Sequence, residues 1–172
     1  MCGHLFIQED KMKRTISVPI GEFRVSTAPD VLITHNLGSC VGIALYDAFS
    51  KIGGLAHISL PNEENINGKS KDPKFANVAI SSMIKKMENI GANRIYIIAK
   101  IAGGGNMFNL KNLPLEMDVG AQNVLAVKKY LARQGIRIVA EDILGYHPRT
   151  MEFELETGKV TLKTKMKGEK YL

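Results

Sequence analysis

The stretch THNLGSCVGIALYDAFSKIGGLAHISLP, from Thr34 to Pro61, decides the fold because it holds two apolar runs separated by a short turn. In the first run, Val41, Ile43 and Leu45 alternate with smaller or polar residues, as expected of a strand with one face in a core. A second extended apolar run spans Ile52–Ile58. The pattern predicts two antiparallel strands joined as a hairpin.

The register of this hairpin decides whether it carries a reactive pair. A turn centred between Ala48 and Phe49 sets Cys40 opposite His57. Directly opposed side chains of antiparallel strands have Cβ atoms about 4.5–5.5 Å apart, close enough for a sulfur and a ring nitrogen to share a proton. A register shift of one residue would put the two side chains on opposite faces.

A cysteine beside a histidine is the arrangement that nucleophilic catalysis by a thiol requires. A neighbouring imidazole can lower the pKa of a thiol from about 8.5 to roughly 3.5–7.5, so the Cys40 thiolate would form before substrate binds. His57 would act as general acid and base, with Thr34, Asn36 or Ser39 orienting its ring. The structural alternative is that the cysteine is a small buried hydrophobic residue and the histidine a packing residue.

Glycines are predicted to bring backbone close to this pair. Gly38 permits a tight turn that exposes the amides before Cys40, as an oxyanion hole requires. The run Gly103–Asn106 follows the apolar strand expected over Arg94–Ala102. This run lacks the Lys-Ser/Thr of a P-loop and the spacing of a dinucleotide fingerprint. We interpret its glycines as positions of close backbone approach.

Composition indicates one globular domain. The 172 residues are 45% hydrophobic and 23% charged, with a net charge of +6. We expect a mobile N-terminal extension over residues 1–14 and a single domain over residues 15–172. Two cysteines, Cys2 and Cys40, lack ligand-spaced partners, which indicates a reducing compartment and no metal. No stretch approaches the roughly 20 apolar residues of a membrane span, so we expect a cytoplasmic protein without membrane insertion.

The spread-out lysines lack the interleaved aromatic residues that stack nucleic-acid bases, so we expect no nucleic-acid partner. The glycine run without nucleotide-binding spacing and the cysteines without ligand-spaced partners indicate no cofactor. Helix signals begin at Asp72 and Asp118 and end at Gly91 and Gly135. Alternating residues over 151–162 predict a terminal hairpin. Together these signals predict an α/β fold of the α+β type, with a mainly antiparallel β core flanked by two to three helices.

Four segments resemble the CheD family, chemoreceptor glutamine deamidases of bacterial and archaeal chemotaxis. The opening stretch has the family's T…LGSCV and GG-apolar-A-H-apolar-apolar-LP segments at the family's spacing. Ala99–Phe108 resembles its AK-apolar-GG…MF segment, and Val119–Asn123 its G…N segment. The likeness covers about residues 20–164. The turn Leu144–Arg149 departs from the family, which usually has two glycines and then Gly-Arg here, and it retains only Arg149.

The resemblance implies a layered β-sandwich with helices outside, with Cys40 as the nucleophile, His57 as the general acid/base and Thr34 as the residue that orients His57. The implied enzyme is a protein-glutamine glutaminase with a role in chemotaxis adaptation. Its substrates would be the cytoplasmic helices of methyl-accepting chemoreceptors, whose acidic surface a basic face would attract. Selected glutamines become glutamates with release of ammonia, and some members also hydrolyse glutamyl methyl esters, both through a thioester.

The resemblance also implies a function of another class, a regulatory binding protein. Family members bind a CheC-type phosphatase, which acts on the phosphorylated response regulator, and stimulate it without needing their own catalysis. The sequence does not rank the two roles. Met107 and Phe108 are candidates either for the core or for an exposed docking patch.

Overall fold

The two predicted strands form a hairpin within a five-stranded sheet, called here the central sheet. The structure is a computed structural model that describes residues 11–62 and 70–172. In spatial order, the central sheet contains β2 (Phe23–Thr27), β5 (Ile52–Ile58), β4 (Val41–Asp47), β6 (Ile97–Gly103) and β7 (Arg137–Ile143). Its neighbouring strands are antiparallel except for β6 and β7, which are parallel.

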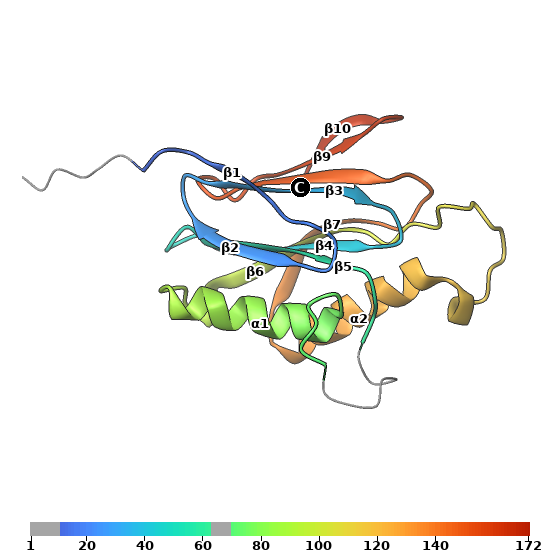
Figure 1. Cartoon of the computed structure of the whole chain (residues 1–172), viewed down its shortest axis with the longest axis horizontal. Coiled ribbons are helices and arrows are strands. Elements are labelled where there is room, and N and C mark those ends of the chain that lie inside the picture. Colours follow the sequence, from blue (N-terminus) through green and yellow to red (C-terminus); the bar gives the residue numbers. More distant parts are fainter. Residues whose placement is uncertain (1–10, 63–69) are drawn as a thin grey trace, which may run out of the picture.

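A second five-stranded sheet, called here the outer sheet, packs on one face of the central sheet (Figure 1). In spatial order it contains β1 (Thr15–Ser17), β3 (Val31–Leu37), β8 (Arg149–Glu154), β9 (Val160–Thr164) and β10 (Gly168–Tyr171). Only β1 and β3 run parallel within it. The expected α+β sandwich with a mainly antiparallel core is confirmed.

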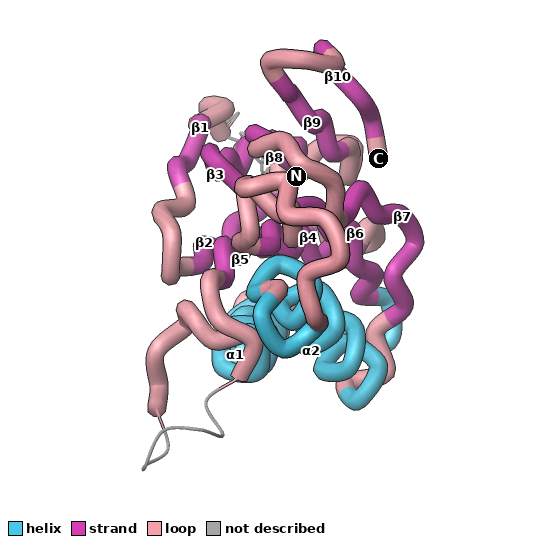
Figure 2. Tube along the Cα trace, turned by 90° about the vertical axis from the view of Figure 1, so that its right-hand side faces the viewer, coloured by secondary structure: helices cyan, strands magenta, loops and turns pink. Residues whose placement is uncertain are grey.

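Both α-helices of the described residues cover the other face of the central sheet, so the molecule has three layers (Figures 1 and 2). The helices are α1 (Ala76–Asn89) and α2 (Val119–Arg133), and two short 3-10 helices are η1 (Arg94–Tyr96) and η2 (Leu115–Met117). None of the helices in the described ranges has the length and apolar content needed to cross a bilayer.

The pleat of β4 divides the interior into two cores, because successive side chains of a strand point to opposite faces. Val41, Ile43 and Leu45 pack against the helices. Ala44 and Tyr46 pack against the outer sheet. All seven residues of the strand are buried, so the hairpin is covered on both faces.

The register predicted for this hairpin was wrong. Gly42, rather than Cys40, lies directly opposite His57. Cys40 precedes Gly42 by two residues, so it remains on the same face as His57, as a diagonal neighbour. Cys40 and His57 therefore lie on one face of the sheet, but Cys40 is displaced by two residues from the position directly opposite His57.

The hairpin turn explains the difference in register. Asp47 pairs with Ile52, so the loop between the strands has four residues. A two-residue loop of type I′ would require positive φ angles at both Ala48 and Phe49, whereas the four-residue loop places one non-glycine residue at positive φ, Lys51 at 52°. The Asp47 carboxylate instead accepts hydrogen bonds from the N–H groups of Phe49 and Ser50, at 3.0 and 3.4 Å, and stabilises the longer turn.

Of the two helix starts predicted from the sequence, at Asp72 and at Asp118, one was wrong and one is confirmed. The start expected at Asp72 was wrong, because its carboxylate accepts a local hydrogen bond from the N–H of Lys74 and α1 begins only at Ala76. Asp118 is confirmed as the residue that caps α2, since its carboxylate accepts a 2.9 Å hydrogen bond from the N–H of Ala121. The terminal hairpin of β8 and β9 is also confirmed.

The mobile extension predicted for residues 1–14 falls mainly outside the described residues, which begin at Lys11. In the described part, Lys11 and Arg14 form ion pairs with the buried carboxylate of Asp30. Burial acts to raise the pKa of Asp30, but hydrogen bonds from Arg14, Ser26 and Lys11 outweigh it and hold that pKa well below its usual range. The boundaries proposed for the domain stay a prediction.

Gly53 of β5 leaves room for side chains that follow and line the outer sheet, which gives a first testable prediction. A Cβ at Gly53 would lie 2.5 Å from Leu155 Cδ2 and 2.9 Å from Phe153 Cε1. We expect Gly53→Ala to lower the free energy of unfolding by about 1–3 kcal/mol, because it overpacks the core between the sheets. Denaturant titration measures this, with the exposed turn substitution Ala48→Ser as control. Equal stability of the two variants would contradict the close approach.

Candidate active site

The hydroxyl of Thr34 joins the two sheets at the ring of His57. Thr34 lies on β3 of the outer sheet and His57 on β5 of the central sheet, and both are buried. Thr34 Oγ1 lies 2.7 Å from His57 Nδ1 and also donates a 2.7 Å hydrogen bond to the carbonyl oxygen of Val18. Of the candidates for orienting this ring, Thr34 is therefore the one that contacts it, rather than Asn36 or Ser39.

These hydrogen bonds assign the tautomer of His57. A hydroxyl has a single proton, and Thr34 donates its proton to Val18, so its oxygen must accept a hydrogen bond from the Nδ1–H of the ring. Nε2 then carries a lone pair. In the described part of the chain, this buried nitrogen has no hydrogen-bond partner. A ring nitrogen held ready to accept a proton is what general base catalysis requires.

Burial sets the charge of this imidazole. The side chain of His57 is 3% exposed. Removal from water disfavours the charged form and lowers the pKa of His57 from 6.5 to about 4. The ring is therefore neutral near pH 7, and its Nε2 is available as a base.

Cys40 lies directly before β4 and packs against the apolar cluster between the two sheets. Its thiol is free and half-buried. Burial raises the pKa of the Cys40 thiol, which is opposite to the direction expected from a charged imidazole neighbour. The neutral ring of His57 supplies no positive charge that would stabilise the thiolate and oppose this effect of burial. Before substrate binds, the pair consists of a thiol and a neutral imidazole on one face of the sheet.

The glycine-rich run after β6 lies against the backbone around Cys40. A Cβ at Gly103 would lie 2.2 Å from the carbonyl oxygen of Cys40. The N–H of Gly104 donates a 2.8 Å hydrogen bond to that same oxygen, and the N–H of Gly105 donates one of 2.8 Å to the carbonyl of Gly38. These contacts confirm that the run is a place of close backbone approach.

Two cavities reach this region. One, of about 310 Å³, is lined by His57 together with Asn36 and residues of the segment that follows β1. The other, of about 450 Å³, is lined by Ser39, the neighbour of Cys40, and by Met107 and Phe108. The first cavity thus lies beside His57, and the second beside Ser39, the residue that precedes Cys40.

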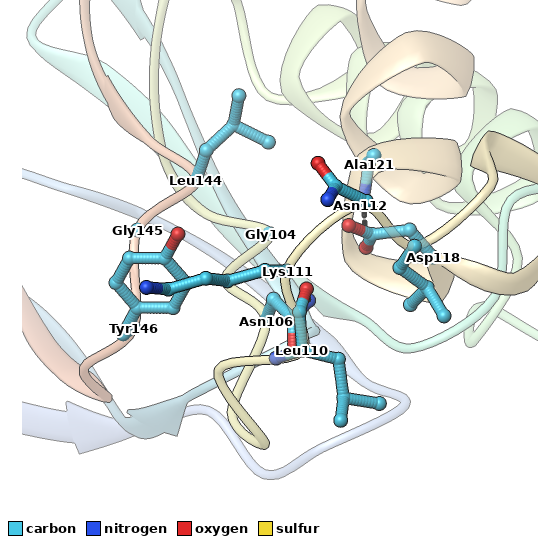
Figure 3. Close-up of a pocket in the computed structure, with 11 residues that line it drawn as sticks. Gly104, Asn106, Leu110, Lys111, Asn112, Asp118, Ala121, Leu144, Gly145 and Tyr146 are labelled. Atoms are coloured by element: carbon cyan, nitrogen blue, oxygen red, sulfur yellow. Dashed lines mark hydrogen bonds between the residues drawn. The ribbon is translucent and has the colours of Figure 1, made fainter.

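A third cavity touches the glycine-rich run at Gly104. It has a volume of about 290 Å³ and lies between Asp118, at the start of α2, and the turn Leu144–Tyr146 (Figure 3). It is not lined by Thr34, Cys40 or His57. The chemistry of the thiol and imidazole, rather than the shape of this cavity, therefore locates the candidate active site.

The divergent turn near this third cavity is held by Arg149. Its buried guanidinium pairs with the Asp142 carboxylate at 2.7 Å and donates a 2.6 Å hydrogen bond to the carbonyl of Leu144. The carbonyl of Gly145 accepts a 2.8 Å hydrogen bond from the N–H of Asn106, which ties the turn to the glycine-rich run. The retained arginine thus stabilises the turn.

Sequence reasoning gave no role to two residues that contact the site, Val18 and Asn123. Val18 acts through its backbone carbonyl, which no side-chain pattern can reveal. Asn123 is a buried amide on the apolar face of α2. A polar residue at an apolar position of a helical repeat was the signal that could have found it.

Comparison with known proteins places the chain in a family. A sequence model described as "CheD chemotactic sensory transduction" matches residues 59–164. The probable chemoreceptor glutamine deamidase CheD of Clostridium novyi (strain NT) is 46% identical over 152 residues, which cover 88% of this chain and 94% of that protein. The protein of the same name from Clostridium botulinum (strain Hall) is 45% identical over 157 residues, or 91% and 97% of the two chains.

The fold and the thiol–imidazole face define a candidate cysteine hydrolase. The matches extend over nearly the whole of this chain and of its relatives. The chain belongs to the CheD family.

The depressed pKa of His57 predicts how stability depends on pH. The unfolded chain binds a proton on this ring at about pH 6.5 and the folded protein only at about pH 4, so folding is disfavoured as pH falls through this range. We expect the free energy of unfolding to drop by up to about 3 kcal/mol between pH 7 and pH 4 on this account. Denaturant titrations at several pH values measure it. His57→Gln should show a shallower decline, and an equally steep decline would contradict the assignment.

Proposed function

We propose that this protein is a chemoreceptor glutamine deamidase in which Cys40, His57 and Thr34 form the catalytic site. The observation that carries the proposal is the Thr34–His57 hydrogen bond, which leaves Nε2 as a base on the face that holds Cys40. The names of the two Clostridium relatives support the same activity. The substrate would be a glutamine on the cytoplasmic helices of a methyl-accepting receptor, and the location in the cytoplasm stays a prediction.

The first chemical step is attack of the Cys40 sulfur on the carbon of the glutamine carboxamide. Because the thiol and the imidazole are both neutral beforehand, His57 Nε2 takes the thiol proton as the carbon–sulfur bond forms. The imidazolium is then stabilised through Nδ1–H by the Thr34 oxygen. This sequence requires the two side chains to approach each other when substrate binds.

The second step releases ammonia. The imidazolium of His57 gives its proton to the departing nitrogen, the carbon–nitrogen bond breaks and Cys40 is left as a thioester. A water molecule then attacks the thioester carbon while Nε2 takes its proton. The carbon–sulfur bond breaks, the sulfur regains a proton from the ring, and glutamate is formed. A glutamyl methyl ester would react in the same way, with methanol as the leaving group.

The backbone before Cys40 supplies donors for the negative charge that develops on the substrate oxygen. The N–H and C=O of a trans peptide point in opposite directions. The carbonyl of Gly38 is bonded to the glycine-rich run, so the N–H of Ser39 points away from that run. Amides held in this way are suited to stabilise an oxyanion, which is commonly a large part of catalysis by acyl transfer.

The catalytic roles predict graded losses of activity. Cys40→Ala should abolish the conversion of glutamine to glutamate in purified receptor fragments, as followed by mass spectrometry. His57→Ala should lower turnover by about 100- to 10,000-fold, because it removes the proton transfers. Thr34→Ala should cost less, since it removes only the partner that orients the ring.

The surface substitution Ala48→Ser serves as the control and should retain wild-type turnover. Deamidation by Cys40→Ala would remove the nucleophile assignment. Equal losses for Thr34→Ala and His57→Ala would mean that orientation of the ring contributes as much as the base itself.

A second candidate role is to dock a CheC-type phosphatase and stimulate it. One specific observation favours it: Phe108 is 84% exposed, and Met107, Leu110 and Met117 beside it are partly or largely exposed. These four residues, called here the apolar patch, all line the 450 Å³ cavity beside Ser39. Exposed apolar surface of this kind typically marks an interaction site.

The two roles are separable with one variant. Cys40→Ala keeps the apolar patch intact, so we expect it to bind a CheC-type phosphatase with wild-type affinity and to stimulate it fully while its deamidase activity is absent. Calorimetry and a phosphatase assay measure the two effects. Loss of stimulation together with deamidation would contradict a separate docking role.

A further inference from the structure

Asn123 of α2 contacts the backbone next to both members of the reactive pair. Its Nδ2 donates a 2.9 Å hydrogen bond to the carbonyl oxygen of Ser39, the residue before Cys40. The same nitrogen donates a 3.1 Å hydrogen bond to the carbonyl oxygen of Ser59, two residues after His57. A single amide group from the helix layer thus bridges the ends of β4 and β5 at which the pair is found.

This bridge completes a set of three contacts. The carbonyls of the three consecutive residues Gly38, Ser39 and Cys40 are bonded by Gly105 N–H, Asn123 Nδ2 and Gly104 N–H, in that order. The peptide between Ser39 and Cys40 is the one that Asn123 holds. Because N–H and C=O of a trans peptide point in opposite directions, this contact aims the Cys40 N–H away from the helix.

The burial of Asn123 argues against a role in packing alone. The side chain is fully buried, and within the described ranges its Oδ1 has no hydrogen-bond partner. An unpartnered buried oxygen is unfavourable for folding, whereas an apolar side chain of the same shape would carry no such cost. The next buried positions on this face of α2, Val124 and Val127, are apolar. An amide at position 123 is therefore explained by the bonds that its nitrogen makes.

We propose that Asn123 is a positioning residue of the active site. It fixes the peptide that carries the Cys40 N–H, which would be a second donor to the oxyanion beside the Ser39 N–H. It also ties the backbone before β4 to the backbone after β5, just beyond the ladder pair of Val41 and Ile58. The residue touches neither substrate nor the reacting atoms. This inference rests on the proposed function, so its test includes a measurement that does not depend on deamidation.

The experiment compares Asn123→Leu and Asn123→Ala with Val127→Ala, a matched control one turn further along α2 whose side chain is also buried. All variants carry Cys2→Ser, so that Cys40 is the one thiol in the chain. The measurements are the melting temperature, kcat and KM for deamidation of a receptor fragment, and the rate at which iodoacetamide alkylates Cys40 from pH 6 to pH 10.

We expect both Asn123 variants to lower kcat at least tenfold with less than a threefold change in KM, because the oxyanion donor acts mainly in the transition state. The dependence of the Cys40 alkylation rate on pH should also differ between the Asn123 variants and the parent protein. Val127→Ala should have a lower melting temperature than the parent protein, whereas its kcat and its alkylation rate at each pH should stay within twofold of the parent values.

Asn123 variants with kcat and alkylation within twofold of the parent would overturn the proposal, and so would a control that loses kcat to the same extent. Failure of both Asn123 variants to fold would also overturn it, because the amide would then belong to the framework of the fold. A parent protein without deamidase activity would sink the proposed function, while the alkylation profiles would still decide whether Asn123 positions Cys40.

Discussion

The structure depends on one hydrogen-bonded chain that crosses from the outer sheet to the central sheet. The carbonyl of Val18 accepts from Thr34, and the Thr34 oxygen accepts from the ring of His57. All of this lies between two packed sheets, where an unpaired polar group is costly. Turning the ring would break these hydrogen bonds between buried groups, so its second nitrogen keeps one orientation.

The same burial determines the electrostatics of the reactive pair. The packing that orients His57 also removes its ring from water, which lowers the pKa of the ring. Burial of Cys40 beside it raises the pKa of the thiol. A pair of neutral groups is the result, and it favours proton transfer during attack over a thiolate formed in advance. Orientation and charge state thus have a common physical cause.

Backbone contacts position Cys40, the proposed nucleophile. Gly103 allows the end of β6 to touch the carbonyl of Cys40, an approach that a Cβ at this position would prevent, and the N–H of Gly104 donates a hydrogen bond to the same carbonyl. Asn123 adds a contact from the helix layer. Each of the three layers of the fold thus supplies part of the proposed site. Thr34 of the outer sheet bonds the ring of His57, the central sheet carries Cys40 and His57 on one face, and Asn123 of α2 bonds the carbonyl of Ser39.

The sequence by itself determined the hairpin strands β4 and β5, the face shared by Cys40 and His57, and the cap of α2, because alternation and capping are local properties of neighbouring residues. It did not predict β10. The stagger of the pair follows from a four-residue loop that Asp47 stabilises by local hydrogen bonds, and apolar alternation alone does not specify the length of that loop. The tertiary structure decided which groups surround the pair. It also decided that Thr34 contacts the ring and that the pair is neutral. Both depend on the packing of one sheet against another, between residues far apart in the chain.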